Sequence, residues 1–99
     1  MYAQLVHATA RPEMRRTADV LLCQKLIPAL REEPGFAGTL NLVDSETGDG
    51  ITIVMWETAE QARRPLNEYS PRLRRALGDI SAALAKVRRF SIWEVSARA

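Results

Sequence analysis

The chain contains few side chains that react at neutral pH. His7 is its only histidine, so a single imidazole is available for proton transfer, although a lone histidine in a strand more often packs or forms a hydrogen bond. Cys23 is the only cysteine, lies in a Leu-Leu-Cys run and is expected to be a small buried side chain. One cysteine and one histidine cannot form an internal disulfide or a structural zinc site of soft ligands. The sequence therefore predicts no metal centre.

The sequence also lacks the local motifs of common enzyme classes. Asp44, Glu46 and Asp49 crowd one short stretch, but their spacing is not that of a calcium-binding loop. Residues 48–50, Gly-Asp-Gly, precede a strand-like apolar run rather than a helix, so they are not a phosphate-binding loop. No Gly-x-Ser-x-Gly nucleophile elbow is present. Any reactive site must therefore be a constellation of separate residues.

A few polar and aromatic residues suit a binding site, and each also has a structural explanation. Asn41 lies in an apolar stretch, where its amide must find a polar partner or face water at a sheet edge. Trp56, like Trp93, suits a core or a subunit interface as well as a ligand-binding wall. Tyr69 directly precedes Ser70 and could brace the break between two short helices. Which role applies depends on the fold.

Apolar periodicity and helix-breaking residues divide the chain into strands and helices. Residues 12–32 carry apolar side chains at three- and four-residue spacing after Pro12, which is typical of an amphipathic helix. Pro28 conflicts with a regular helix there, and we expect it to kink the helix or end it early. The run Ile-Thr-Ile-Val-Met-Trp-Glu is typical of a strand. The complete pattern predicts strands at 2–9, 36–44, 51–57 and 86–95 and helices at 12–32, 58–65 and 70–84.

Turn and capping residues indicate where these elements begin and end. The link 45–50 holds Gly48 and Gly50, which supply the positive φ angles of a hairpin, so its flanking strands should be antiparallel neighbours. The sequence Thr-Ala-Glu-Gln at 58–61 matches a helix capping box. Ser70 and Pro71 then supply an N-cap and a first-turn proline for another helix. The second helical region is therefore predicted to be broken in two.

The order of elements, βαββαβ, is that of the ferredoxin-like arrangement, an α+β fold with helices on one face of a four-stranded antiparallel sheet. The strands, however, are apolar on both sides. In the 51–57 strand, Ile51, Ile53 and Met55 alternate with Val54 and Trp56. Two helical regions can cover only one face, and a large uncovered apolar face is rare in monomers. We therefore expect a homodimer in which two sheets pack face to face through a two-fold contact.

Length and composition indicate one folded domain spanning residues 1–99. The chain has 99 residues, of which 46% are hydrophobic and 26% are charged, and this balance excludes a disordered chain. No stretch approaches the roughly 18 consecutive apolar residues of a membrane helix. Residues 1–9 do not resemble a signal peptide. We therefore expect no membrane segment and a cytoplasmic location.

The net charge of +2 conceals an asymmetry along the chain. Residues 1–62 hold five basic and nine acidic side chains, whereas residues 63–89 hold eight basic and two acidic ones, for a net charge of +6 in that segment. Such a segment could attract an anionic partner. It lacks the motifs and stacking aromatic residues of nucleic-acid-binding proteins, so a solvated surface is the favoured interpretation and nucleic acid is not an expected partner.

Residues 34–62 contain several short motifs in a recognisable order. These are Pro34-Gly35-Phe36-Ala37-Gly38, Leu42-Val43-Asp44, Ile53-Val54-Met55-Trp56-Glu57-Thr58 and Glu60-Gln61-Ala62. Together with the order of elements over the full chain, they resemble the antibiotic biosynthesis monooxygenase family, whose members are small ferredoxin-like proteins that form dimeric α+β barrels. The motifs are mainly structural, since Pro-Gly joins helix to strand and Trp-Glu-Thr ends a strand and caps a helix. The resemblance therefore implies the fold more strongly than an activity.

Some members of that family oxidise polycyclic aromatic substrates with O₂ and use neither metal nor flavin. The resemblance thus implies an oxidoreductase, a cofactor-independent monooxygenase whose small aromatic or polyketide-like substrate is held in an apolar cleft. Such a site needs an aromatic wall, a proton acceptor and a group that stabilises the anion. Trp56 would then stack on the substrate, and Tyr69 or His7 would accept the proton. Asn41 or Arg72 would stabilise the resulting anion.

An alternative of a different class is a noncatalytic dimeric domain of the same fold that binds a ligand or a partner. Other relatives degrade haem with an Asn, Trp and His set, in which the Trp and the His lie in the second helical region. Residues 58–84 contain neither Trp nor His, so haem degradation is not expected. The sequence accordingly predicts no cofactor.

Overall fold

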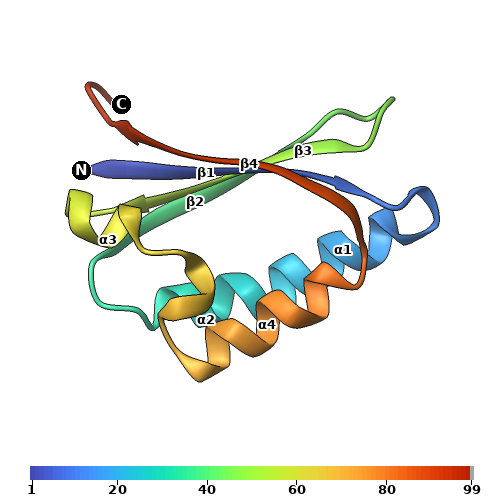
Figure 1. The fold of residues 1–99 in the computed structure, drawn as a ribbon, viewed down its shortest axis with the longest axis horizontal. Helices are drawn as coiled ribbons and strands as arrows, with labels where there is room; N and C mark the ends of the chain where they lie inside the picture. The colour runs from blue at the N-terminus through green and yellow to red at the C-terminus, as the bar shows by residue number, and fades with distance from the viewer. Residues whose placement is uncertain (99) are drawn as a thin grey trace.

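The computed structural model describes residues 1–98, except for the side chains of residues 88–90. Its four strands form one antiparallel sheet in the order β2-β3-β1-β4, and the helices lie on one face of that sheet (Figure 1). The predicted ferredoxin-like α+β fold is therefore confirmed. The strands are β1 (Tyr2–Ala10), β2 (Phe36–Val43), β3 (Asp49–Trp56) and β4 (Leu84–Glu94).

The first helical region is continuous but not uniform. It consists of a 3-10 turn η1 (Pro12–Met14), helix α1 (Arg15–Leu21), a π-helical turn η2 (Leu22–Leu26) and helix α2 (Ile27–Arg31). Pro28 has no N–H, and in a regular α-helix its ring would crowd the carbonyl four residues earlier. The wider turn η2, in which the Ile27 N–H bonds to the carbonyl of Leu22, precedes the proline directly. The helix thus accommodates Pro28 by widening one turn rather than by ending early.

The second helical region is broken in two, as predicted. Helix α3 (Ala59–Arg63) begins with the capping box, in which the hydroxyl of Thr58 accepts from the N–H of Gln61 and the Gln61 side chain accepts from the N–H of Thr58. A 3-10 turn η3 (Leu66–Glu68) follows, and α4 (Pro71–Ser81) begins where the Ser70 hydroxyl accepts from the N–H of Leu73. Local capping therefore positions both helices.

The β2–β3 hairpin fixes which side chains share a face of the sheet. Its turn is closed by the Asp44 carboxylate, which accepts two backbone N–H groups, and by Gly48 at φ 77°. The resulting register places Asn41 directly opposite Thr52. It also places Leu42 opposite Ile51, so these two apolar side chains share the other face.

The core lies between the sheet and the helices and is centred on β3. Trp56 and Val54 of β3 are wholly buried against Leu30 of α2 and Leu73 of α4. Cys23 does not belong to this core. It is exposed, so the prediction that it is a small buried side chain was wrong. The π-helical turn rotates the residues around it, which apolar spacing alone does not reveal.

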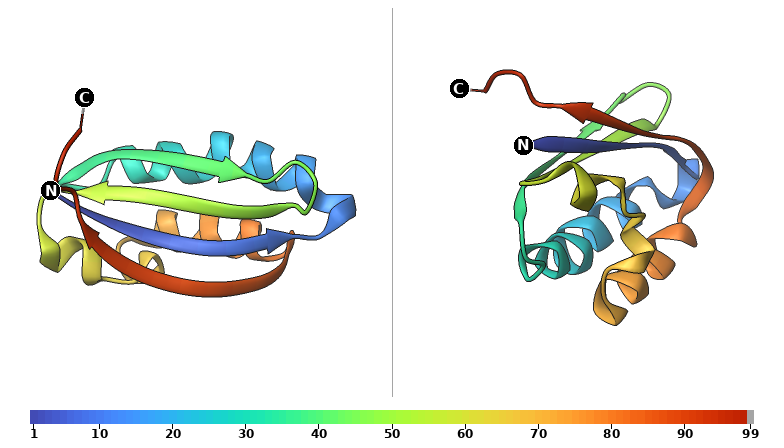
Figure 2. Two further views of the ribbon diagram at one scale, coloured as in Figure 1. Left: turned by 90° about the horizontal axis from the view of Figure 1, so that it is seen from above. Right: turned by 60° about the vertical axis from the view of Figure 1, so that its left-hand side comes forward.

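The opposite face of the sheet is not covered by any element of residues 1–98 (Figure 2, left). Leu40 and Leu42 of β2 and Trp93 of β4 lie on this face and are 56%, 50% and 58% exposed. The two-sided apolar character predicted from the sequence is thus present in the fold. None of the helices in the described part of the chain has the length and apolarity needed to span a bilayer.

Candidate functional site

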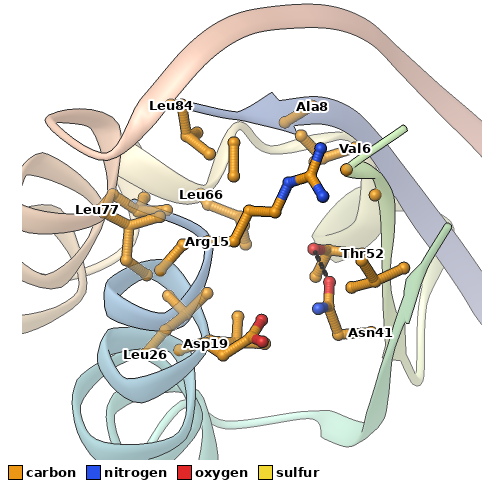
Figure 3. Close-up of a pocket in the computed structure, with 17 residues that line it drawn as sticks. Val6, Ala8, Arg15, Asp19, Leu26, Asn41, Thr52, Leu66, Leu77 and Leu84 are labelled. Carbon is orange, nitrogen blue, oxygen red and sulfur yellow. Dashed lines mark hydrogen bonds between the residues drawn. The ribbon is translucent and has the colours of Figure 1, made fainter. Parts of the chain in front are cut away.

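A partly open cavity of about 130 Å³ lies between the sheet and the first helical region, at the end of the sheet near the β2–β3 hairpin (Figure 3). Its walls come from β1, β2 and β3 on one side and from α1, η2 and α4 on the other. Most of the lining is aliphatic or backbone. The apolar lining residues with the largest side chains are Val6, Leu22, Leu26, Val43, Leu66, Leu77, Ile80 and Leu84.

Four polar side chains line this cavity and face it from two layers. Asn41 and Thr52 come from neighbouring strands, and Arg15 and Asp19 come from α1 (Figure 3). The hydroxyl of Thr52 donates to the amide oxygen of Asn41 at 2.8 Å. Because that oxygen is held by Thr52, the Asn41 amide nitrogen is the group left free to donate to a ligand.

Among the described side chains that line the cavity, only those of Arg15 and Asp19 are ionisable. They lie one helical turn apart, but no ion pair joins them in the described structure. The Asp19 carboxylate is exposed at the rim, whereas Arg15 is half-buried and extends toward β1 (Figure 3). The cavity thus combines an apolar floor with one cation, one carboxylate and one amide.

Sequence reasoning selected Asn41 but missed Arg15, Asp19 and Thr52. Arg15 and Asp19 precede Leu22 by seven and three positions, so they continue the apolar stripe of the helix, and charged residues on such a stripe are unusual. Thr52 could have been found from the hairpin register, which pairs it with Asn41. These signals have meaning only once the helix face and the strand pairing are known.

Trp56 and Tyr69 lie together but away from this cavity. Trp56 lies four positions after Thr52 on β3, a distance of roughly 13 Å along a strand. The Trp56 and Tyr69 rings are stacked with centroids 4.5 Å apart, and Phe36 packs edge-on against Trp56. The indole N–H donates to Gln4 at 2.6 Å. Because Trp56 is wholly buried and its N–H is engaged, it has no surface free for a ligand in this structure.

The hydroxyl of Tyr69 donates a hydrogen bond to the backbone carbonyl of Gln61. Burial raises the pKa of Tyr69 to about 12, with the charge of Arg64 opposing the rise and that of Glu33 adding to it. Arg64 lies over the Tyr69 ring, 5.1 Å from its centroid. The phenol is therefore protonated at neutral pH and serves as a hydrogen-bond donor there.

His7 and Arg72 lie elsewhere again. His7 is opposite Ile51 on the uncovered face of the sheet and borders a shallow hollow at the hairpin end. Arg72 is exposed on α4 and forms an ion pair with Glu32. The structure therefore brings together only Trp56 and Tyr69 among the five predicted site residues. The catalytic roles of all five stay predictions.

The basic segment 63–89 is partly engaged in contacts within the chain. Besides the Arg72 ion pair and the stacking of Arg64, Arg74 donates to the backbone carbonyl of Asn67 at 3.1 Å. The side chains of Arg88 and Arg89 lie outside the described residues. Within the described part, no cluster of three or more His, Cys, Asp or Glu side chains could hold a metal ion.

Comparison with solved structures places the fold among known ones. The "putative antibiotic biosynthesis monooxygenase" from Bordetella bronchiseptica superposes with a TM-score of 0.83 at 12% identity, over 97% of both chains. A protein of the same description from Nitrosomonas europaea gives 0.78 at 14% identity, over 98% of this chain and 100% of the other. A monooxygenase from the gene ActVA-Orf6 of Streptomyces coelicolor, in complex with the ligand nanaomycin D, gives 0.78 at 18% identity, over 99% and 89%.

These similarities establish the fold over nearly the whole chain. No family profile matches the sequence, and no curated protein matches it either. The predicted resemblance to antibiotic biosynthesis monooxygenases is therefore confirmed for the fold. It is not extended to the site residues, because these can differ between proteins that are 12% to 18% identical.

Proposed function

We propose that this protein is a cofactor-independent monooxygenase that oxidises a small aromatic or polyketide-like molecule with O₂ in the cavity between the sheet and the helices. The observation that carries the proposal is the cavity itself. It is apolar, holds four polar side chains from two layers, and lies in a fold shared with solved monooxygenases. Its volume of about 130 Å³ approaches the roughly 150 Å³ of a protein cavity that binds benzene, so one ring fits inside.

The proposed chemistry requires the substrate to supply the electrons. In an anthrone-like substrate, loss of a proton gives an electron-rich anion, which reduces O₂. The methylene carbon loses two hydrogens and gains one oxygen atom to become a ketone, and the other oxygen atom leaves with the two hydrogens as water. Because atoms and electrons balance without a further reductant, the protein needs only to orient the ring, accept the proton and stabilise the anion.

The residues of the cavity can divide these tasks. Asp19 is the only carboxylate among the described lining residues and acts as the proton acceptor. The Asn41 amide, oriented by Thr52, donates to the oxygen on which negative charge develops. Arg15 adds a positive charge that favours the anion over the neutral substrate.

Oxygen consumption tests this proposal. An anthrone-like substrate should drive O₂ uptake without added metal, and Asn41→Ala and Asp19→Asn should each lower the rate about tenfold or more because each removes a group from the proton-transfer step. Gln24→Ala is the matched control, since Gln24 is exposed on the same helical region and does not line the cavity. Wild-type rates in both cavity variants, with intact folding by circular dichroism, would contradict the proposal.

A noncatalytic ligand-binding domain is the second candidate. It is favoured by the scarcity of ionisable groups, because one exposed carboxylate is the only candidate base among the described residues that line the cavity. The test is to add an aromatic ligand at protein concentrations high enough to detect a single turnover. Binding of the ligand without O₂ consumption and without product would support this candidate over the oxygenase.

We also propose that the protein is a homodimer with its two uncovered sheet faces packed together. Leu40, Leu42 and Trp93 are at least half exposed on that face, beside Ile51 and Ile53. An isologous contact between two such faces removes all of this surface from water at once. Light scattering at low micromolar concentration should give about twice the chain mass of 11.1 kDa, and a clean monomer would contradict the proposal.

A further inference from the structure

The guanidinium of Arg15 lies at the wall of the cavity and has no partner among the described residues. Its Nε atom is inaccessible to solvent and has no hydrogen-bond partner, and Arg15 takes part in no ion pair of the described structure. Leaving a buried N–H unpaired is unfavourable, and folded proteins seldom do so without a reason. The terminal nitrogens of the guanidinium are not buried in this way and have no partner in the described structure either, so a ligand in the cavity could accept hydrogen bonds from them.

The hairpin turn provides the space that this side chain occupies. Gly48 is buried and has φ 77°, and a Cβ placed on it would lie 2.5 Å from Nε of Arg15 and 2.7 Å from one of its terminal nitrogens. The guanidinium can therefore lie flat along the backbone only because residue 48 has no side chain. Figure 3 shows Arg15 reaching across the cavity toward Val6 and Ala8. The planar group thus lies in the cavity lining rather than extending into solvent.

The rest of the cavity determines what kind of anion fits. Its lining is mainly aliphatic, and its volume of about 130 Å³ suits a single ring. A guanidinium matches the planar, two-oxygen geometry of a carboxylate better than a point charge does. The free amide nitrogen of Asn41 offers another donor to the same ligand. Together, these features favour a ligand with a flat apolar ring that carries one planar anionic group.

Asp19 restricts the charge of that ligand. Its carboxylate lines the same cavity one turn from Arg15 and would repel a second negative charge. It also competes with the ligand for the guanidinium, because a residue at this spacing can reach Arg15 by a rotamer change. A monoanion is therefore favoured over a dianion such as a phosphate monoester.

We propose that the cavity binds monocyclic aromatic monoanions, with the carboxylate or an equivalent planar oxyanion on Arg15 and the ring among the aliphatic side chains. This inference rests on the proposed function, because it takes the cavity to be the substrate site. It narrows the substrate to an anionic one-ring compound or to a larger molecule that presents such a ring. Benzoate has no methylene group to oxidise, so its binding and the turnover of an oxygenase substrate can fail separately.

Titration of the ¹⁵N-labelled protein with benzoate, followed by amide chemical shifts, tests the proposal. Benzoate should shift amides of residues around Arg15, Asn41 and Gly48, and benzyl alcohol, its neutral counterpart, should bind at least tenfold more weakly. Arg15→Gln should weaken benzoate binding at least tenfold. Arg16→Gln removes the same charge from an exposed position outside the cavity, so it should leave binding within about twofold of wild type.

Two further measurements test the proposal even if Arg15→Gln disturbs the fold. Asp19→Asn should bind benzoate several-fold more tightly, because the competing carboxylate is removed, and phenyl phosphate as a dianion should bind more weakly than benzoate to the wild type. Absence of benzoate binding, equal binding of benzoate and benzyl alcohol, or equal losses in Arg15→Gln and Arg16→Gln would each overturn the proposal. A failure of O₂ consumption alongside benzoate binding would overturn only the oxygenase.

Discussion

At the scale of single residues, Gln4 links parts of the chain that are distant in sequence. Its side chain is wholly buried on β1, its oxygen accepts from the Trp56 N–H at 2.6 Å, and its nitrogen donates to the backbone carbonyl of Arg64 at 3.0 Å. Both of its polar ends are therefore satisfied inside the core. A glutamine in a strand is usually a solvent-facing residue, and its burial depends on the Trp56 side chain 52 positions away.

Substitution of Gln4 should therefore lower the free energy of unfolding, and the size of the loss should depend on whether Trp56 is present. Gln4→Leu keeps the apolar contacts but leaves the indole N–H and a backbone carbonyl unpaired, and we expect a loss of about 2 kcal/mol in the free energy of unfolding. Trp56→Phe should cost at least about 1 kcal/mol less in the Gln4→Leu background than in the wild type, because the N–H that it removes is no longer bonded. Urea denaturation of the four proteins in this double-mutant cycle provides the measurement, and additive losses would contradict the coupling.

Tyr69 makes stability depend on pH in the alkaline range. The unfolded phenol ionises near pH 10, whereas the folded one has a pKa of about 12, so the folded state binds more protons between these values. The stabilisation is therefore complete below about pH 10 and is lost as the pH rises toward 12. Between about pH 9 and about pH 11, the free energy of unfolding should fall more steeply in the wild type than in Tyr69→Phe. Parallel slopes would show that Tyr69 does not contribute.

At the scale of elements, the helices begin where local hydrogen bonds satisfy their first N–H groups. The capping box at Thr58 and Gln61 starts α3, and the hydroxyl of Ser70 starts α4. Gln61 also donates to the carbonyl of Pro34 at 2.9 Å, so the cap ties α3 to the turn before β2. A Cβ at Gly35 would collide with this glutamine side chain, which explains why the turn after α2 needs glycine.

Removal of the Thr58 hydroxyl tests the contribution of this cap. Thr58→Ala should lower the free energy of unfolding by about 1 kcal/mol, because the N–H of Gln61 loses its acceptor. Thr17→Ala is the control, since Thr17 is exposed within α1 and caps no helix, and it should leave stability unchanged or slightly higher. Thermal unfolding followed by circular dichroism separates the two, and equal effects would argue against a capping role.

The first helical region shows where element prediction from sequence is limited. Its extent and its apolar face follow from the spacing of its residues, and Pro28 was correctly identified as a source of irregularity. The form of that irregularity was not predictable, because a proline can be accommodated by a break, a kink or a wider turn. Packing of Leu26, Ala29 and Leu30 into the core keeps the helix continuous, so the chain adopts the wider turn.

At the scale of the whole molecule, the sheet has two apolar faces and only one is covered by helices. Leu42 lies on the uncovered face of the edge strand β2 and is 50% exposed. If that face is the dimer interface, Leu42→Glu should raise the dissociation constant at least tenfold, or about 1.4 kcal/mol, because the contact would bury a carboxylate in each subunit.

Val20→Glu provides a matched comparison for this substitution. Val20 is 42% exposed on α1, in the helical layer, and should tolerate glutamate without a change in association. Sedimentation over a range of protein concentrations measures both dissociation constants. Equal behaviour of Leu42→Glu, Val20→Glu and the wild type would rule out the uncovered sheet face as the interface.

The sequence by itself determined the order of elements, both helix caps, the hairpin and the ferredoxin-like fold, because these depend on residues within a few positions of each other and on alternation along each strand. Tertiary structure alone decided the site. Arg15 reaches the cavity because it lies over Gly48. Trp56 lies outside the cavity because its contacts with Gln4 and Tyr69 place it in the core. Such contacts join residues far apart in the chain, so they cannot be predicted until it is known how the sheet and the helices pack.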